Sequence, residues 1–462
     1  MKKSLLSLSL IALTGFNGFF SQTIIIPQTT TKKIAPANAA HANELMTPGR
    51  NCLTPVPDEA WDLAFNAMVE QFKQNQIANK TSTNTTYTIP VIVHVIHNGE
   101  AVGTGSNISS TQINSQITIL NNDYMSAGLN NANCPAAFTS VKSNTGITWC
   151  MATKDEIGNV LAEPGIDRIN RNTLSFTAPP YSNTGYIDGT IKPNTIWDPT
   201  LYCNIWVLNL GSSLLGYATF PAGTGLAGLT GVGTSSNDGV VIGYGYFGNT
   251  SSGFAPYNKG RTASHELGHW LGLRHINGDS NCGNDYCADT PTQDQLHGGC
   301  ISSSTPYHVN VCGAGTSPNG EMTMNFMDYT DDNCMYMFTN DQTTRMNTAL
   351  TNGTYRSGLT ASSGTLCVGV GTQFTATEDK ADVILFPNPA SNTLSVSTTF
   401  KKENNVTIKI YSAIGEMVSS RQIANTLGGT YNFDISAISS GIYFVTLSSS
   451  EKTVTKRFIV DK

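Results

Sequence analysis

Charged side chains are scarce in this chain, and nowhere do they gather into a basic block. Lysine, arginine, aspartate and glutamate make up 13% of the 462 residues, and the formal net charge is −6. Nucleic acids and anionic membranes are bound by concentrated positive charge, so this composition argues against both as partners. Beyond residue 21 the chain also lacks a run of about 20 apolar residues, the length that a membrane-spanning helix requires. We therefore expect a soluble mature protein.

The N-terminal 21 residues have the features of a secretory signal peptide. Lys2 and Lys3 provide a positive start, and an apolar run follows from Leu5 to Phe20 with small residues near its end. Glycine and asparagine residues interrupt this run, which argues against a transmembrane helix. The sequence predicts export of the chain and removal of residues 1–21.

No two of the ten cysteines form a CxxC pair, so a structural zinc site made of cysteines is not indicated. Five cysteines lie between residues 282 and 334, a density that suggests disulfides and an oxidising compartment. The alternative of buried thiols remains open for four others: Cys134, Cys150, Cys203 and Cys367.

Histidine is rare as well, yet three of the eight histidines fall within the eleven residues from His265 to His275. His265 and His269 are four residues apart, so a helix places them on one face, where both imidazoles can reach one metal ion. Glu266 projects beside that face and can act as a general base toward a water molecule there. Gly272 permits a left-handed turn that ends the helix and lets His275 return as a third ligand. Three protein ligands predict a catalytic zinc site.

Polar residues on a solvated helix face are the alternative explanation of a short HExxH motif. The extended pattern HExxHxxGxxH is much more specific, because its glycine stands where the helix must break. Leu267, Trp270 and Leu271 also give the helix a separate apolar face to bury. We therefore predict one helix with a core side and a metal side.

Strand and helix patterns alternate before this motif. The almost continuous β-branched run Ile89–Ile96 is typical of a strand buried on both faces, and we expect core or hydrogen-bonding roles for His94 and His97. Ser109 or Ser110 can cap the helix that follows. Further strands are expected at Gly146–Ala152, Tyr202–Leu210 and Gly239–Tyr244. The pattern predicts an α+β fold with a twisted mixed sheet backed by helices.

HExxHxxGxxH is the signature of the metzincin metalloproteases, whose second hallmark is a methionine turn below the metal. The stretch Asn325–Met335 resembles the methionine turn of the pappalysin (cytophagalysin) family, with Met327 as the turn methionine. Other segments are similar to that family as well: Ile89–Val95, Asn107–Ser109, Gly216–Pro221 and Asp238–Ile242. The resemblance covers residues 85–360 and implies a metzincin-like catalytic domain with a zinc cleft.

The resemblance implies a secreted zinc endopeptidase that acts on protein or peptide substrates. In such an enzyme Glu266 takes a proton from the attacking water, and zinc and Tyr329 stabilise the oxyanion. Leu215–Phe220 is expected to contain the edge strand with which an extended substrate pairs. Asp331 and Asp332, after the methionine turn, suggest a pocket for a basic side chain. The alternatives are a secreted adhesin or surface structural protein with a metalloprotease-like domain, and a zinc amidase; the intact motifs argue against both.

The loop after the motif helix carries cysteines, oxygen donors and two histidines. The family pattern implies the disulfides Cys287–Cys312 and Cys300–Cys334, and it leaves Cys282 without a named partner. Calcium prefers about six to eight oxygen ligands, and related enzymes bind calcium in this loop. Four residues there carry suitable oxygens, Asp279, Asp285, Asp289 and Thr290, of which the last three are our candidate ligands. Solvated loop acids are an equally good explanation, and we interpret His297 and His308 as solvated.

Residues 22–84 are biased in composition and are interpreted as a propeptide. An amphipathic helix is predicted after Pro57 and Asp58, with apolar residues at helical spacing. Cys52 precedes this helix. Propeptide cysteines that occupy the open metal position are known in the resembled family, so Cys52 is a candidate latency switch, although Leu53 departs from the glycine expected after it. An unpaired or disulfide-bonded cysteine is the alternative.

The last eighty residues differ in character from the rest. A Gly/Ser/Thr-rich stretch, 361–382, predicts a linker, and alternating short strands in 383–462 predict a small β-sandwich. Phe386–Pro389, Gly441–Tyr443 and Lys456–Phe458 resemble the C-terminal sorting domain of type IX secretion cargo. This implies export via the periplasm, handled by that secretion machinery, with release or attachment at the outer surface. A carbohydrate-binding or adhesive sandwich is the alternative.

Overall fold

The computed structural model divides the chain into two compact units, Met1–Val370 and Gly371–Lys462. The signal peptide predicted at 1–21 and residues 368–382 of the predicted linker lie outside the residues that the structure describes. The described residues are 52–79, 86–211, 214–226, 229–301, 306–367, 383–386, 390–412, 416–449 and 453–462.

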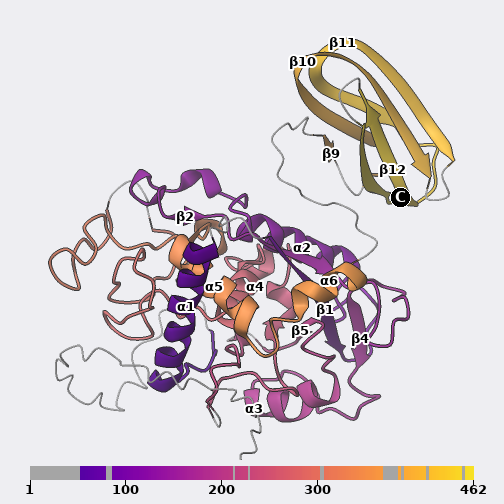
Figure 1. Cartoon of the computed structure of the whole chain (residues 1–462). Helices are drawn as coiled ribbons and strands as arrows, with labels where there is room; N and C mark the ends of the chain where they lie inside the picture. Colours follow the sequence, from indigo (N-terminus) through magenta and orange to yellow (C-terminus); the bar gives the residue numbers. More distant parts are fainter. Residues whose placement is uncertain are drawn as a thin grey trace, which may run out of the picture. The chain divides into compact units, whose positions relative to one another are not determined.

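A six-stranded mixed sheet is the framework of the first unit (Figure 1). Its strands are β1 (Tyr87–His97), β3 (Ile147–Met151), β4 (Ile166–Asn170), β5 (Cys203–Leu208), β6 (Gly216–Ala218) and β7 (Val240–Gly243). The order is β3-β1-β5-β7-β6, and β4 also pairs with β1. All pairings are parallel except that of β6, the edge strand, with β7. The predicted α+β class with a mixed sheet is therefore confirmed.

The central strand β1 is buried on both faces, which explains its nearly unbroken apolar sequence. Val91 and Val93 join the core that contains the helix residues Ile113 and Leu267. Ile92, on the opposite face, packs in a cluster with Ala152, Tyr202 and Leu366. His94 has the hydrogen-bonding role expected, because its ring lies 2.9 Å from both Asp167 Oδ2 and Asn204 Oδ1.

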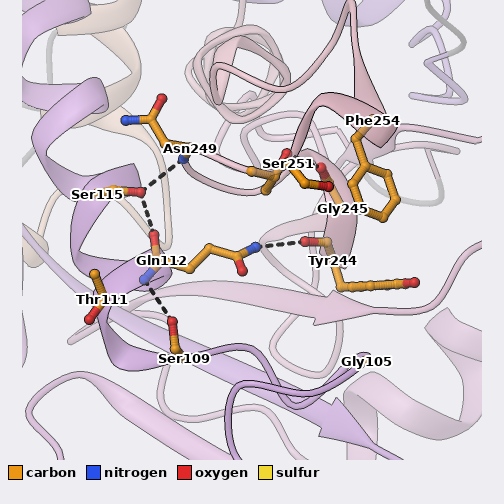
Figure 2. Close-up of a pocket in the computed structure, with 11 residues that line it drawn as sticks. Gly105, Ser109, Thr111, Gln112, Ser115, Tyr244, Gly245, Asn249, Ser251 and Phe254 are labelled. Atoms are coloured by element: carbon orange, nitrogen blue, oxygen red, sulfur yellow. Dashed lines mark hydrogen bonds between the residues drawn. The ribbon is translucent and has the colours of Figure 1, made fainter.

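Helix α2 (Ser110–Tyr124) begins where Ser109 caps it. The Ser109 hydroxyl accepts a hydrogen bond from the backbone N–H of Gln112 at 3.1 Å. The Gln112 side chain donates to the carbonyl of Tyr244 at 2.9 Å, and the Ser115 hydroxyl accepts from the N–H of Asn249 at 2.9 Å (Figure 2). Ser109 thus fixes the start of α2, and Gln112 and Ser115 hold the helix against the segment after β7.

The motif helix α4 (Arg261–Trp270) is buried along its whole length beside β6 and β7. Two helices follow it in the sequence: α5 (Asn340–Asn352), which starts with a capping box of Thr339 and Gln342, and α6 (Leu359–Leu366). The predicted propeptide helix is α1 (Glu59–Asn79), and it packs against α5. The short elements are β2 (Lys142–Ser143), β8 (Phe338–Thr339), α3 (Thr184–Tyr186), a π-turn at Ile187–Ile191 and 3-10 turns at Asn131–Asn133, Ala136–Phe138, Lys192–Asn194, Tyr244–Tyr246, Ser252–Phe254 and Asp332–Cys334.

The start of the predicted linker, at residue 361, was wrong. Residues 361–366 belong to α6, whose Leu359, Ser362 and Leu366 are buried. Cys367 is disulfide-bonded to Cys150 at the end of the sheet strand β3. The Ser/Thr-rich composition that suggested a linker was misleading, because small polar residues on the exposed face of a short helix have the same composition.

The second unit is a small antiparallel β domain of five strands in one sheet, ordered β11-β10-β12-β13 with β9 beside β10. The strands are β9 (Ile384–Phe386), β10 (Thr393–Ser412), β11 (Met417–Asp434), β12 (Gly441–Ser448) and β13 (Thr453–Val460). Its core cluster is formed by residues between Val383 and Val460, among them Leu394, Ile408 and Phe458. The strand predictions at the chain end hold, but β10 and β11 are longer than the alternating patterns indicated. Among the described residues, no helix is long and apolar enough to cross a membrane.

Candidate metal centre

Three imidazoles converge at the C-terminal part of α4. His269 Nε2 lies 3.2 Å from His265 Nε2 and 3.1 Å from His275 Nε2, and all three side chains are buried. The two helical histidines meet because they are one turn apart. His275 joins them because the chain reverses at Gly272, whose φ of 91° is the left-handed conformation that favours glycine.

Each of these rings is oriented through its other nitrogen. His265 Nδ1 lies 2.7 Å from the carbonyl oxygen of Phe326, His269 Nδ1 lies 2.7 Å from that of Leu273, and His275 Nδ1 lies 2.5 Å from Asp279 Oδ1. When Nδ1–H donates to such an acceptor, the Nε2 lone pair is left for a metal. Burial, and then the neighbouring His275, lowers the pKa of His269 to about 3, so this ring is neutral, as a ligand must be.

The donor set fits zinc. In a tetrahedral site with zinc–nitrogen distances of about 2.0 Å, neighbouring ligand atoms are about 3.3 Å apart, close to the separations of the three nitrogens. A fourth donor, Cys52 Sγ, lies within 4.8 Å of the three imidazole nitrogens. Imidazole and thiolate ligands bind zinc in preference to hard cations such as calcium and magnesium.

Glu266 lies beside this cluster, in contact with the propeptide segment. Its Oε2 accepts hydrogen bonds from Cys52 Sγ at 3.2 Å and from the Thr54 hydroxyl at 2.9 Å. The Thr54 hydroxyl in turn accepts from the N–H of Ala218 at 2.9 Å, and the N–H of Leu53 donates to the carbonyl of Gly216 at 3.3 Å. Residues 52–54 therefore lie along the edge strand β6, which the sequence predicted as the substrate-pairing strand.

The Cys52 thiol is buried against a carboxylate. Burial, and then the charge of Glu266, raises its pKa well above the ordinary thiol value. We expect the Cys52 thiol to be neutral in this setting. A metal ion bound beside it would reverse this preference and favour the thiolate.

The methionine turn lies directly below the histidines. Met327 is fully buried, and a Cβ atom placed on Gly268 of α4 would come within 2.5 Å of its sulfur. The ring of Tyr329 lies 5.0 Å from that of His275, between centroids, and its hydroxyl is 3.5 Å from the carbonyl oxygen of Cys52. The glycine of the helix thus lets the turn approach the metal cluster, and Tyr329 reaches the side of the cluster where Cys52 lies.

Comparisons with known proteins agree with this geometry. A family model described as pregnancy-associated plasma protein-A matches residues 185–351. The structure of mature mirolysin of Tannerella forsythia in complex with a cleaved peptide is 37% identical, covers 61% of this chain and 98% of that chain, and superimposes with a TM-score of 0.52. The structure of a promirolysin mutant of the same organism is 36% identical, with 67% and 94% coverage and a TM-score of 0.53. This chain belongs to the pappalysin family of metzincin metalloproteases.

Two further matches concern export. A secretion system C-terminal sorting domain model matches residues 384–461 of this pappalysin. An extracellular metalloprotease of Sordaria macrospora is 28% identical over 299 residues, which is 64% of this chain and 86% of the relative. The protein is therefore a secreted metalloendopeptidase with a sorting domain at its C-terminal end.

One of the two predicted disulfides of the pappalysin is wrong. The structure joins Cys282, rather than Cys287, to Cys312, and it has the expected Cys300–Cys334 bridge. Cys287 is a buried free thiol. The two candidates are five residues apart in one loop, so sequence spacing alone could not distinguish them, whereas the folded loop turns Cys287 into the protein beside Asp285.

The candidate calcium ligands are only partly brought together. The Thr290 hydroxyl lies 2.9 Å and 2.8 Å from the two oxygens of the buried Asp285 carboxylate. Asp289 instead accepts a hydrogen bond from the N–H of Asp341 at 3.0 Å, and its other oxygen is buried without a hydrogen bond. Burial, opposed by Thr290, raises the pKa of Asp285 to about 7. Asp279 is not part of this group, and its carboxylate contacts His275 and Arg274 instead.

Two other expectations for this part of the pappalysin are corrected. His297 is not solvated: only 3% of its surface is exposed, and it lies between Asp328 and Glu321. Its neighbour His308 is partly buried. Asp332, expected near a substrate pocket, is buried and accepts hydrogen bonds from the N–H groups of Lys259 and Arg261, so it caps α4 instead.

Sequence reasoning missed the buried clamp between the propeptide and the motif. Arg274 Nε donates to Asp62 Oδ1 at 3.0 Å and Arg274 Nη2 donates to the carbonyl of Pro57 at 2.8 Å. The signal available in the sequence was Arg274, directly before the third histidine. If such an arginine is buried, it needs an acidic partner.

A surface cavity at the start of α2 is separate from this centre. Serine, threonine, glycine and amide side chains line it together with Tyr244 and Phe254 (Figure 2). It contains no histidine, cysteine or carboxylate among its lining residues, so it offers none of the groups that the protease chemistry needs.

Proposed function

We propose that this secreted metalloprotease cleaves peptide bonds with zinc held by His265, His269 and His275, with Glu266 as general base. The convergence of three Nε2 atoms 3.1–3.2 Å from their neighbours, with a carboxylate at their side, is the observation that carries the proposal. A zinc ion in such a site lowers the pKa of bound water to about 7 and polarises a carbonyl group.

The residues of this chain then have separate tasks. Glu266 accepts a proton from the attacking water and delivers it to the leaving amine. The Tyr329 hydroxyl donates a hydrogen bond to the developing oxyanion. Strand β6 offers its edge to an extended peptide, in the place that residues 52–54 occupy in the zymogen. Met327 packs below α4 and binds neither metal nor substrate.

The test is cleavage of casein by the mature enzyme and by its Glu266→Ala variant. We expect the variant to lose activity by on the order of 10²–10⁴ or more, while elemental analysis still finds zinc. Glu156→Ala is the matched control, because Glu156 is an exposed carboxylate of the same unit. A fully active Glu266→Ala variant, or an activity that a zinc chelator does not abolish, would refute the proposal.

We further propose that Cys52 keeps the zymogen latent by donating its sulfur to the metal. Support comes from the thiol's place among the three histidines and from its contact with Glu266, which blocks the base as well. Cys52→Ala should activate prematurely or faster, whereas Cys203→Ala, which removes a buried thiol outside this cluster, should not. Unchanged activation kinetics of Cys52→Ala would reject the switch.

Calcium binding by Asp285, Asp289 and Thr290 is also proposed. The buried carboxylate of Asp285 lacks an adjacent cation in hydrogen-bond contact among the described residues, and its raised pKa reflects that environment. Calorimetric titration of the zymogen with calcium should show binding that Asp285→Asn abolishes. Binding retained by that variant would remove Asp285 from the site.

For the domain limits we propose a propeptide at 22–84, a catalytic domain at 85–367 and a sorting domain at 383–462, with the linker starting after Cys367. The disulfide at Cys367 and the matched range of the sorting domain support these limits. Mass spectrometry of the secreted protein should place the mature N-terminus near residue 85 and the mature C-terminal end after Cys367.

A further inference from the structure

A second group of metal-binding side chains lies in the long loop after α4. Asp294, His297, His308 and Glu321 each offer one ligand atom, and these four atoms lie within 4.8 Å of one another. They come from three separate stretches of the loop: Asp294, His297 and His308 lie within the segment that the Cys282–Cys312 disulfide closes, and Glu321 follows it. Among the described residues, this and the catalytic cluster are the two groups of this kind.

Three separations between the ligand atoms are close to those of a tetrahedral site. His297 Nε2 is 3.0 Å from Glu321 Oε2, and His308 Nδ1 is 3.3 Å from Asp294 Oδ1 and 3.6 Å from Glu321 Oε2. Zinc ligands at about 2.0 Å from the metal are about 3.3 Å from each other. The catalytic histidines of this chain have nearly the same separations, 3.1 Å and 3.2 Å.

Two of these atoms are buried without a hydrogen bond. His297 Nε2 and Glu321 Oε2 lack a hydrogen-bond partner, although they face each other. Their side chains are 2% and 0% exposed. Such atoms are costly in a protein interior, and the cost disappears when both bind the same cation.

The surrounding residues hold the ligands as outer-shell partners of a metal do. Asp328 Oδ2 lies 2.9 Å from His297 Nδ1, and Asp328 Oδ1 accepts from the N–H of the same residue at 2.7 Å. The second oxygen of Glu321 accepts from the N–H of Asp294 at 3.0 Å. A carboxylate on Nδ1 leaves Nε2 as the ligand atom, the arrangement found behind many zinc-bound histidines.

The donor set also selects the class of ion. Two imidazole nitrogens and two carboxylate oxygens suit zinc and other divalent first-row transition metals, whereas calcium requires mostly oxygen. The two carboxylate charges that the site encloses would be balanced by one divalent cation.

We infer that Asp294, His297, His308 and Glu321 bind a second zinc ion, distinct from the catalytic one. Through Asp328, which follows Met327 and precedes Tyr329, this ion braces the methionine turn. The described residues of the loop between α4 and the turn form no helix or strand, so a bound metal and two disulfides would supply most of the order of this loop.

The test counts zinc ions in the full-length zymogen carrying Glu266→Ala, which prevents self-cleavage. Elemental analysis after exhaustive dialysis should find two zinc ions per chain, one in His308→Ala, one in His275→Ala and none in the variant with both changes. His308 is the most exposed of the four ligands, so its removal perturbs the fold least. His97→Ala is the matched control and should keep both ions, because His97 lies outside both clusters.

A measurement without substitutions completes the test. Crystals of the zymogen should give a second anomalous peak at the zinc absorption edge between His297, His308 and Glu321. One zinc ion per chain, no second peak, or a second ion that persists in His308→Ala would overturn the inference.

Discussion

At the scale of single residues, most of the candidate catalytic side chains are held in place by a short hydrogen bond in addition to the contact that catalysis requires. The three histidines carry acceptors on Nδ1, and Glu266 Oε2 accepts hydrogen bonds from Cys52 and Thr54. Tyr329 differs, since its hydroxyl has one long contact, 3.5 Å, to the propeptide. We expect a group held by so long a contact to become available to substrate if residues 52–54 leave, as proposed above.

Tyr329→Phe tests this availability. Removing one donor to an oxyanion costs on the order of 10²-fold in kcat, so we expect a loss of that size with KM little changed. Peptide hydrolysis by the mature enzyme measures it. Tyr244→Phe, in the separate cavity at α2, is the matched control and should be fully active. Equal kcat values for Tyr329→Phe and the parent would exclude the hydroxyl from the reaction.

Glu100 gives a pH prediction. Its carboxylate accepts hydrogen bonds from the Ser106 N–H at 2.8 Å, the Ser106 hydroxyl at 2.6 Å and the Asn98 N–H at 2.7 Å. Against the opposing effect of burial, these bonds lower its pKa from 4.5 to about 2. A depressed folded-state pKa means that the stabilisation is present above the unfolded pKa and is lost as the pH falls through the folded one.

Glu100→Gln should therefore be less stable than the parent at neutral pH, and the difference should shrink as the pH falls from about 5 to about 2. Denaturant unfolding across that range measures it, with Glu156→Gln as an exposed control. A difference that stayed constant with pH would show that the ionised form of Glu100 is not what stabilises the loop.

At the scale of elements, helix α1 acts as a clamp on the catalytic unit. Trp61, Phe65 and Val69 pack with Phe220 and Ala349, while Asp62 on the same helix binds Arg274. The helix therefore combines an apolar face with a buried ion pair, and it holds residues 52–54 at the metal cluster.

Asp62→Asn should weaken this clamp. A hydrogen bond to a charged group contributes about 1.5–3 kcal/mol, and Arg274 would retain Asp279 as its remaining acid. We expect activation about tenfold faster or more, since about 1.4 kcal/mol corresponds to a factor of ten. Activation time courses measure it.

This prediction contains its own control. Residue 62 belongs to the proposed propeptide, so the mature enzymes of parent and variant are the same molecule and must have equal kcat/KM. Gln74→Ala, a change at an exposed position of α1, should leave activation unchanged. Parent-like activation of Asp62→Asn would assign the clamp to the apolar contacts alone.

At the scale of the whole molecule, the chain consists of two units with separate cores. The core of the C-terminal unit contains only residues from 383 onward, and the other clusters end at Leu366. Among the described residues, each buried cluster belongs to one unit, so we expect catalysis and sorting to be separable.

Ending the chain after Val370 should leave kcat/KM and the melting temperature of the catalytic unit unchanged, and it should stop secretion. Cell fractionation and thermal unfolding test the two halves of this prediction. Secretion of the shortened chain would mean that residues 384–461 are not the sorting signal, despite their match to a sorting domain.

Local patterns were sufficient for much of this protein. The spacing of His265, Glu266 and His269, the left-handed Gly272 and the strand run at Ile89–Ile96 depend on neighbours a few residues away, so periodicity and turn chemistry predicted them. The methionine turn was likewise predicted from a short sequence motif, Asn325–Met335.

Contacts between distant segments were decided only by the tertiary structure. Cys52 and Glu266 are 214 residues apart, and Arg274 reaches Asp62 across 212. The choice of Cys282 over Cys287, and the burial of His297 against Asp328, also depend on how a long irregular loop closes. Such a loop has no periodicity to reveal which of its side chains face inward, so its disulfides and its histidines became interpretable only after folding had brought them together.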